Sequence, residues 1–98
     1  MVFVKELLLN GAEWDCRDDV YTSFFRAVEA PDWHGRNFDA LRDSIEIGQI
    51  NNVEPPYRVI IQNYSQIGPG ACQMASQFVD LLREIGSRGC PVEVVIKT

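Results

Sequence analysis

Three acidic residues share one face of a predicted helix. Asp39, Asp43 and Glu46 lie in segment 38–47, where apolar residues recur at helical spacing. At about 100° per residue, the three carboxylates fall within about 60° of one another. The apolar residues occupy the opposite side: Phe38, Leu41 and Ile45. Like charges four apart destabilise a helix by a few tenths of a kcal/mol, and a purely structural helix would usually mix signs at these positions. Arg42, between the two faces, offsets part of this repulsion.

An ordinary helix start is the alternative interpretation of the same stretch. Asn37 is a suitable N-cap, and the helix dipole favours Asp39 in the first turn. We expect Gly35 to supply a positive φ angle for the turn, and Trp33 and His34 to pack over the helix entry. This interpretation does not account for the two acids further along the helix.

Catalysis and metal binding are less well supported by these residues. Paired carboxylates perform acid–base chemistry only in a pocket that separates their pKa values, and no nucleophile stands beside a base in the sequence. A cation could bind Asp39 and Asp43, but the pattern of a calcium loop is missing. His34 is the single histidine and is more typical of packing or surface. We therefore predict no enzyme, cofactor or metal.

The three cysteines, Cys16, Cys72 and Cys90, have neither a paired count nor zinc-site spacing. Reduced thiols in a cytosolic protein are expected. Cys72 falls in the predicted first turn of the last helix, where a thiolate is favoured. It could act as a nucleophile only if it met His34 in space.

Length and charge limit the classes of function. The chain has 98 residues and a net charge of −5, with 46% hydrophobic residues, which predicts one globular domain, 1–98. An acidic surface argues against direct binding of nucleic acids or anionic membranes and permits a basic partner. No segment approaches the length of a membrane span, and the N-terminal segment lacks the features of a signal peptide.

Strands and helices are predicted to alternate along the chain. Runs of β-branched and aliphatic residues predict strands at 2–9, 57–62 and 91–98, with loops at 48–56 and 63–70. Helical spacing predicts a helix capped by Asp18 or Asp19 and ending before Pro31, a second over 38–47, and a third that Gly86 or Gly89 ends. The expected fold is a small α/β structure with a three-stranded parallel sheet and helices packed on it.

The stretch PDWHGRNFDALRD, residues 31–43, resembles a motif of the barstar family, intracellular inhibitors of a secreted bacterial ribonuclease. The matching positions are Pro31, Gly35, Asn37, Asp39, Ala40, Leu41 and Asp43. Further matches cover nearly the whole chain: Asn10-Gly11, Asp19, Arg83-Glu84 and Gly89-Cys90.

The resemblance implies a binding protein that plugs a ribonuclease active site with the second helix and the preceding loop. Asp43 would be the central anchor in a phosphate-binding cleft, Asp39 would lie beside it, and Glu84 would reach the rim. The contact residues would be Trp33, His34, Gly35, Asn37, Asp39, Arg42, Asp43, Glu46 and Glu84. The implied protein is cytoplasmic and monomeric when free, and its partner is a basic secreted ribonuclease.

Several positions depart from the family pattern. Arg42 replaces a large aromatic residue, Arg36 and Arg88 replace acids, and Trp33 and His34 replace two tyrosines. The loop after the second helix is also longer. These changes keep open an immunity-type or regulatory interaction module whose partner is not a ribonuclease. An enzyme that uses Cys72 is the third possibility.

Overall fold

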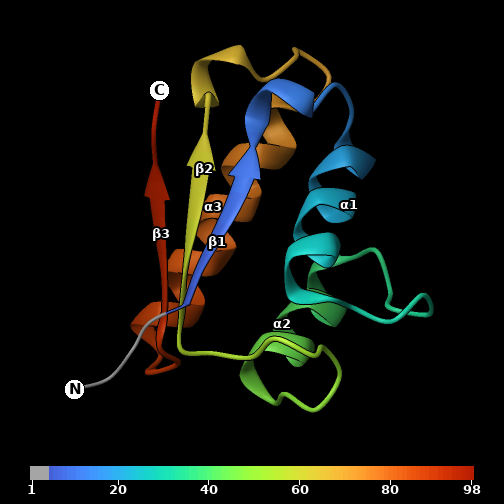
Figure 1. Ribbon diagram of the computed structural model, residues 1–98, viewed down its shortest axis with the longest axis vertical. Coiled ribbons are helices and arrows are strands. Elements are labelled where there is room, and N and C mark those ends of the chain that lie inside the picture. The colour runs from blue at the N-terminus through green and yellow to red at the C-terminus, as the bar shows by residue number, and fades with distance from the viewer. Residues whose placement is uncertain (1–4) are drawn as a thin grey trace.

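The structure is a computed structural model that describes residues 5–98 (Figure 1). Its elements are β1 Lys5–Asn10, α1 Arg17–Val28, α2 Phe38–Glu46, β2 Tyr57–Gln62, α3 Cys72–Ser87 and β3 Val92–Ile96, with short 3₁₀ helices η1 Gly11–Glu13 and η2 Tyr64–Gln66. The predicted order of strands and helices is confirmed. The predicted strand 2–9 includes residues 2–4, which lie outside the residues that the structure describes.

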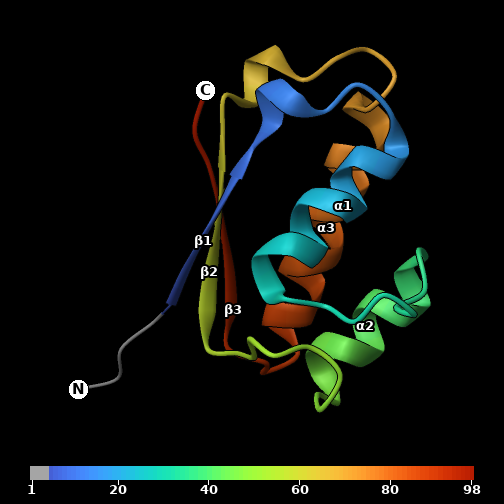
Figure 2. The ribbon, with the colours of Figure 1, turned by 45° about the vertical axis from the view of Figure 1, so that its right-hand side comes forward.

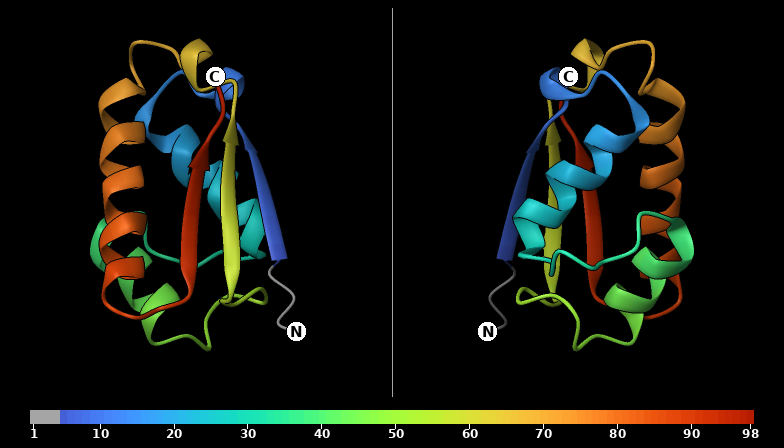
Figure 3. Two further views of the ribbon diagram at one scale, coloured as in Figure 1. Left: turned by 90° about the vertical axis from the view of Figure 1, so that its left-hand side faces the viewer. Right: turned by 90° about the vertical axis from the view of Figure 1, so that its right-hand side faces the viewer.

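The three strands form one parallel sheet in the order β1-β2-β3. Leu7 pairs with Val59, which pairs in turn with Val94. Every crossover moves in the same direction along the sheet, so a single crossover handedness places every helix on the same face. Figures 2 and 3 show α1, α2 and α3 together on that face. The predicted α/β fold class is therefore confirmed.

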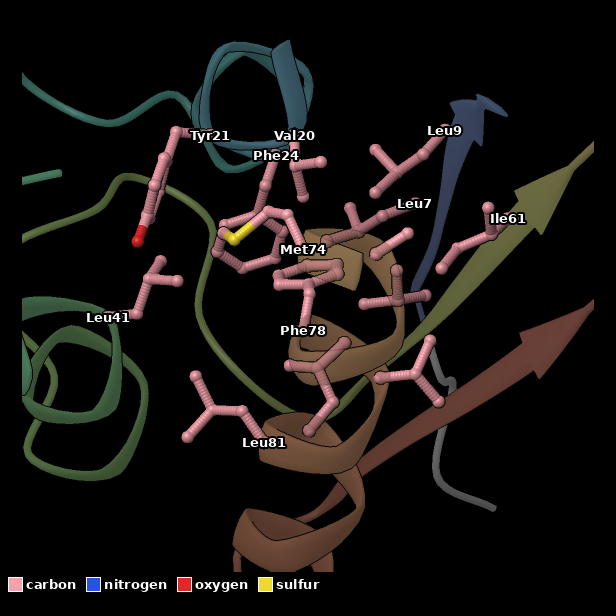
Figure 4. Close-up of a cluster of buried hydrophobic side chains, with 14 of the residues drawn as sticks. Leu7, Leu9, Val20, Tyr21, Phe24, Leu41, Ile61, Met74, Phe78 and Leu81 are labelled. Carbon is pink, nitrogen blue, oxygen red and sulfur yellow. The ribbon is translucent and has the colours of Figure 1, made fainter. Parts of the chain in front are cut away.

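Alternating residues of the sheet face the helices and form the core. Leu9 and Ile61 are 1% and 0% exposed, and Phe24 of α1 meets Phe78 of α3 with ring centroids 5.4 Å apart. The close-up in Figure 4 shows Leu41 of α2 at the margin of the same cluster, beside Tyr21. The apolar spacing seen in the sequence thus brings all three helices to one core.

Among residues 5–98, no helix covers the opposite face of the sheet (Figure 3). Arg58 in the central strand bridges Glu6 at 3.3 Å and Glu93 at 3.0 Å, and Leu8 is 60% exposed. Opposite charges directly across neighbouring strands stabilise the pairing.

The start of α1 differs from the prediction. The helix begins at Arg17 with Cys16 as N-cap, so neither Asp18 nor Asp19 is the cap. Asp19 is the third residue of the helix, and its Oδ2 accepts hydrogen bonds from the backbone N–H groups of Asp15 at 2.8 Å and Cys16 at 3.1 Å. A carboxylate at this position reaches back to the entering chain, which explains a helix start before the acid.

The long loop after α2 packs against the end of α1. Gly48, at φ +83°, turns the chain, and the N–H of Val53 donates to the carbonyl of Val28 at 3.0 Å. Val53 also packs against the core.

Two other connections follow β2 and α3. The segment predicted as the loop 63–70 contains η2. Gly89, at φ +99°, follows the end of α3.

Candidate protein-binding surface

Helix α2 lies at one end of the helical layer, near the residues where β2 and β3 begin (Figures 1 and 2). Leu41 and Ile45 are 0% and 2% exposed and anchor one side of the helix in the core. Asp39 and Asp43 are exposed on the other side. The predicted division into an apolar and an acidic side is confirmed.

Asn37 caps α2, as predicted. Its Oδ1 accepts a hydrogen bond from the N–H of Ala40 at 2.8 Å. The expectation of a positive φ angle at Gly35 is wrong, because the left-handed glycines of residues 5–98 are Gly48 and Gly89. Gly35 provides space instead: a Cβ there would lie 3.1 Å from the Cβ of Ala40 and 3.2 Å from Nδ2 of Asn37. The loop therefore approaches the helix start closely.

Two aromatic residues of the loop before α2 point in different directions. Trp33 is 73% exposed, whereas His34 is 6% exposed and lies over the ring of Phe25 with centroids 4.3 Å apart. Nδ1 of His34 lies 2.9 Å from the carbonyl oxygen of Gly35 and donates to it as the protonated ring nitrogen. The side chain of His34 supports the loop from inside and leaves Trp33 as its exposed aromatic residue.

Arg36 fixes the same loop to α1. Its Nη1 donates to Oδ1 of Asp18 at 2.8 Å and to the hydroxyl of Thr22 at 3.1 Å. Its guanidinium carbon also lies 5.5 Å from the centroid of the Phe25 ring. The positive charge of Arg36 is thus engaged within the molecule.

Asp39 and Asp43 differ from Glu46, the third acid of α2, because their carboxylates have no partner among the described residues. Within residues 5–98, neither side chain forms an ion pair or a hydrogen bond. They lie one helical turn apart on an exposed side of α2. Both carboxylates are available to accept charge-assisted hydrogen bonds from a partner.

Glu46 and Glu84, by contrast, are paired with arginines. Nη2 of Arg42 donates to Oε2 of Glu84 at 3.0 Å, and Nη1 of Arg42 lies 3.5 Å from Oε1 of Glu46. Arg88 lies 4.0 Å from Glu46 and 3.8 Å from Glu84. We call these four residues the four-charge cluster; it joins the end of α2 to the end of α3.

The Arg42–Glu84 pair is the strongest link of the cluster. Its hydrogen bond is the main reason that the pKa of Glu84 lies below and the pKa of Arg42 above its usual value. The side chain of Arg42 is 27% exposed, and its buried Nη1 forms no hydrogen bond with the residues described. Arg42 thus holds the two helices together instead of standing free between two aspartates.

Ile47 is a candidate contact residue that was missing from the sequence prediction. It is 75% exposed at the C-cap of α2 and follows Asp43 by four residues. The spacing Asp39, Asp43, Ile47 was visible in the sequence as one helical row. Trp33 and Ile47 are exposed apolar residues just before and just after the acidic helix.

Cys16, Cys72 and Cys90 are free cysteines, and within residues 5–98 none of their thiols forms a hydrogen bond with His34. Cys72 is the first residue of α3, and its thiol lies 3.4 Å from the carbonyl oxygen of Gly68. Cys90 is partly buried, which raises the pKa of its thiol. The described residues contain no group of three or more His, Cys, Asp or Glu able to hold a metal ion. None of the helices in 5–98 has the length and apolar character needed to cross a membrane.

A comparison with curated proteins found no match. A family model described as "Barstar (barnase inhibitor)" matches residues 4–97 of the 98-residue chain. The three-stranded parallel sheet with three helices agrees with this match. The chain belongs to the barstar family.

Proposed function

We propose that this protein inhibits a basic, secreted ribonuclease by covering its active site with α2 and the loop before it. The observation that carries the proposal is the pair of exposed, unpaired carboxylates of Asp39 and Asp43 on a helix whose other side is fixed in the core. The membership in a family of barnase inhibitors supports the same conclusion.

The chemistry of inhibition follows from the charge of the substrate. A ribonuclease must bind the phosphates of RNA and therefore lines its cleft with cationic side chains. The carboxylate of Asp43 would take the place of a phosphate and accept hydrogen bonds from that cluster, with Asp39 beside it. Trp33 would supply a flat apolar contact, while His34, Gly35 and Asn37 would hold the loop and the helix start in shape.

The acidic row also has a kinetic role. Two unpaired carboxylates on one surface create a local negative field that attracts a basic partner before contact. Their mutual repulsion falls when cationic groups neutralise them, so the free surface is prepared for a positive partner. The producing cell would keep the inhibitor in the cytoplasm, as a monomer, and export the ribonuclease.

Capture of the partner tests this proposal. The immobilised protein is incubated with cell extract and culture medium of the source organism, and the bound fraction is assayed for RNA cleavage. We expect a small basic ribonuclease whose activity disappears on addition of an equimolar amount of the soluble protein. Recovery of only non-nucleolytic partners would contradict the proposal and favour an immunity-type or regulatory module.

A further inference from the structure

The four-charge cluster has no net charge, because Arg42 and Arg88 balance Glu46 and Glu84. Every member has a partner inside the molecule. The two glutamates therefore add little to the negative field of Asp39 and Asp43, although they belong to the same end of the molecule. On α2 itself, the carboxylates without a partner among residues 5–98 are those of Asp39 and Asp43.

Arg88 is the least satisfied member of the cluster. Its side chain is 58% exposed, and its distances of 3.8 and 4.0 Å to the two glutamates are too long for hydrogen bonds. It borders a cavity of about 470 Å³ lined by Glu46, Arg88, Gly89, Cys90 and Pro91. A guanidinium group with free donors beside an open cavity is suited to bidentate binding of a carboxylate.

We propose that Arg42 and Arg88 restrict the acidic surface to ribonucleases that are basic opposite Asp39 and Asp43 and carry a carboxylate opposite Arg88. This inference rests on the proposed function and specifies the partner further. Arg42 forms ion pairs with Glu46 and Glu84. The exposed guanidinium group of Arg88 would then be the positive charge that the partner meets.

The physical reason is the balance of charge at the rim. A cleft that is basic throughout would repel Arg88 and find Glu46 and Glu84 already paired. A partner with one carboxylate at this position would instead gain a charge-assisted pair with Arg88. Charges placed in this way discriminate between partners through repulsion as much as through attraction.

Barnase, the enzyme that the family description names, serves as the probe, since a ribonuclease cleft must bind the phosphates of RNA. We compare the unchanged protein with Arg42→Gln and Arg88→Gln, and use Lys97→Gln as a control with the same change in net charge. Lys97 is exposed beyond β3, at the opposite end of the sheet from α2 (Figure 1). At low salt, each arginine variant should associate with barnase about two- to fivefold faster, and Lys97→Gln should change the rate less than either.

Arg88→Gln is the decisive variant, because loss of the Arg42–Glu84 bond can loosen the junction of α2 and α3. Circular dichroism and thermal unfolding check that each variant is folded. Equal rates for Arg88→Gln and Lys97→Gln would overturn the inference, and so would failure of the unchanged protein and both arginine variants to bind barnase. Neither result depends on the ribonuclease captured from the source organism. The inference about Arg88 can therefore fail while the proposed function still holds.

A second experiment tests the predicted carboxylate directly. The probes are barnase variants in which single lysines or arginines around the active site are changed to glutamate. At least one variant should bind the unchanged protein about threefold or more tightly than barnase does, and should lose this gain with Arg88→Gln. A panel in which no such gain appears, or in which the gain persists without Arg88, would overturn the inference.

Discussion

Asn37 and Gly35 shape the start of α2 by different means. Asn37 caps the helix through its side-chain oxygen, and Gly35 allows the loop to approach Ala40. The cap could be predicted from the sequence because Asn in front of an apolar helical pattern is a local signal. The role of Gly35 could not, because its close contacts depend on the path of the whole loop.

Replacement of Asn37 by alanine should lower the free energy of unfolding by about 1 kcal/mol, the usual contribution of an N-cap. Urea denaturation measures this change. Asn52→Ala is the matched control, since Asn52 is exposed and its side chain forms no hydrogen bond within the described residues. Equal stabilities of the two variants would show that the cap contributes nothing.

Residue type alone does not show which acids near α2 are paired with arginines. Asp39, Asp43 and Glu46 form one row in the sequence, yet in the structure Glu46 lies beside Arg42 and Arg88. Glu84 reaches this place from α3 and Arg88 from the C-cap of that helix, more than forty residues after α2 begins. The i,i+4 pair Glu84–Arg88 was visible in the sequence, but the contact of Arg42 with Glu84 depends on how the helices pack.

Helix α1 carries the carboxylate of Asp19 in its first turn. Hydrogen bonds from the N–H groups of Asp15 and Cys16 to Asp19 hold the pKa of that carboxyl below its usual value of 3.8. Because the folded pKa is depressed, this stabilisation is present above the unfolded pKa and is lost as pH falls through the folded pKa. Glu84 contributes in the same direction through its bond to Arg42.

Asp19→Asn should therefore reduce the free energy of unfolding at neutral pH and flatten its decline below about pH 4. Urea denaturation between pH 7 and pH 2 measures both effects. Asp80→Asn, which changes an exposed acid without an ion pair among residues 5–98, is the control. If the stability of Asp19→Asn declined as steeply with falling pH as that of the control, the role of Asp19 at the helix start would be refuted.

Most element types were predictable because hydrophobic spacing is a strong local signal. The strand 57–62 and the helix from Phe38 were predicted with their observed starts. The start of α1 was predicted too late because an acid at the third helical position looks like a cap in the sequence alone. The path of the loop 48–56 was not predictable, since it depends on backbone hydrogen bonds to the end of α1.

In the whole molecule, the proposed binding helix α2 lies at the end of the sheet where ligands of open parallel α/β folds generally do not bind. Small ligands of such folds generally bind beyond the carboxyl ends of the strands. Here α2 lies near the residues where β2 and β3 begin, at the opposite end (Figures 1 and 3). An exposed helix with unpaired acids and flanking apolar residues is better suited to a protein surface than to a small molecule.

The net charge of −5 and the local field of α2 predict association that depends on salt. The association rate with the captured ribonuclease should fall about tenfold or more between 0.02 and 0.5 M salt, with a smaller change in the dissociation rate. Stopped-flow fluorescence measures both rates. An association rate independent of salt would argue against electrostatic steering.

Asp43 is the proposed anchor of the ribonuclease. Asp43→Ala would leave cationic groups of the cleft buried and unpaired, so we expect affinity to fall by about 30-fold or more, mainly through faster dissociation. Glu13→Ala removes the same charge from η1, at the other end of the molecule (Figure 1), and should change affinity less than about twofold.

Inhibition of RNA cleavage by the captured ribonuclease, titrated with the unchanged protein, Asp43→Ala and Glu13→Ala, is the most direct measurement. We expect a large loss of inhibition for Asp43→Ala alone. Equal inhibition by all three proteins would contradict it.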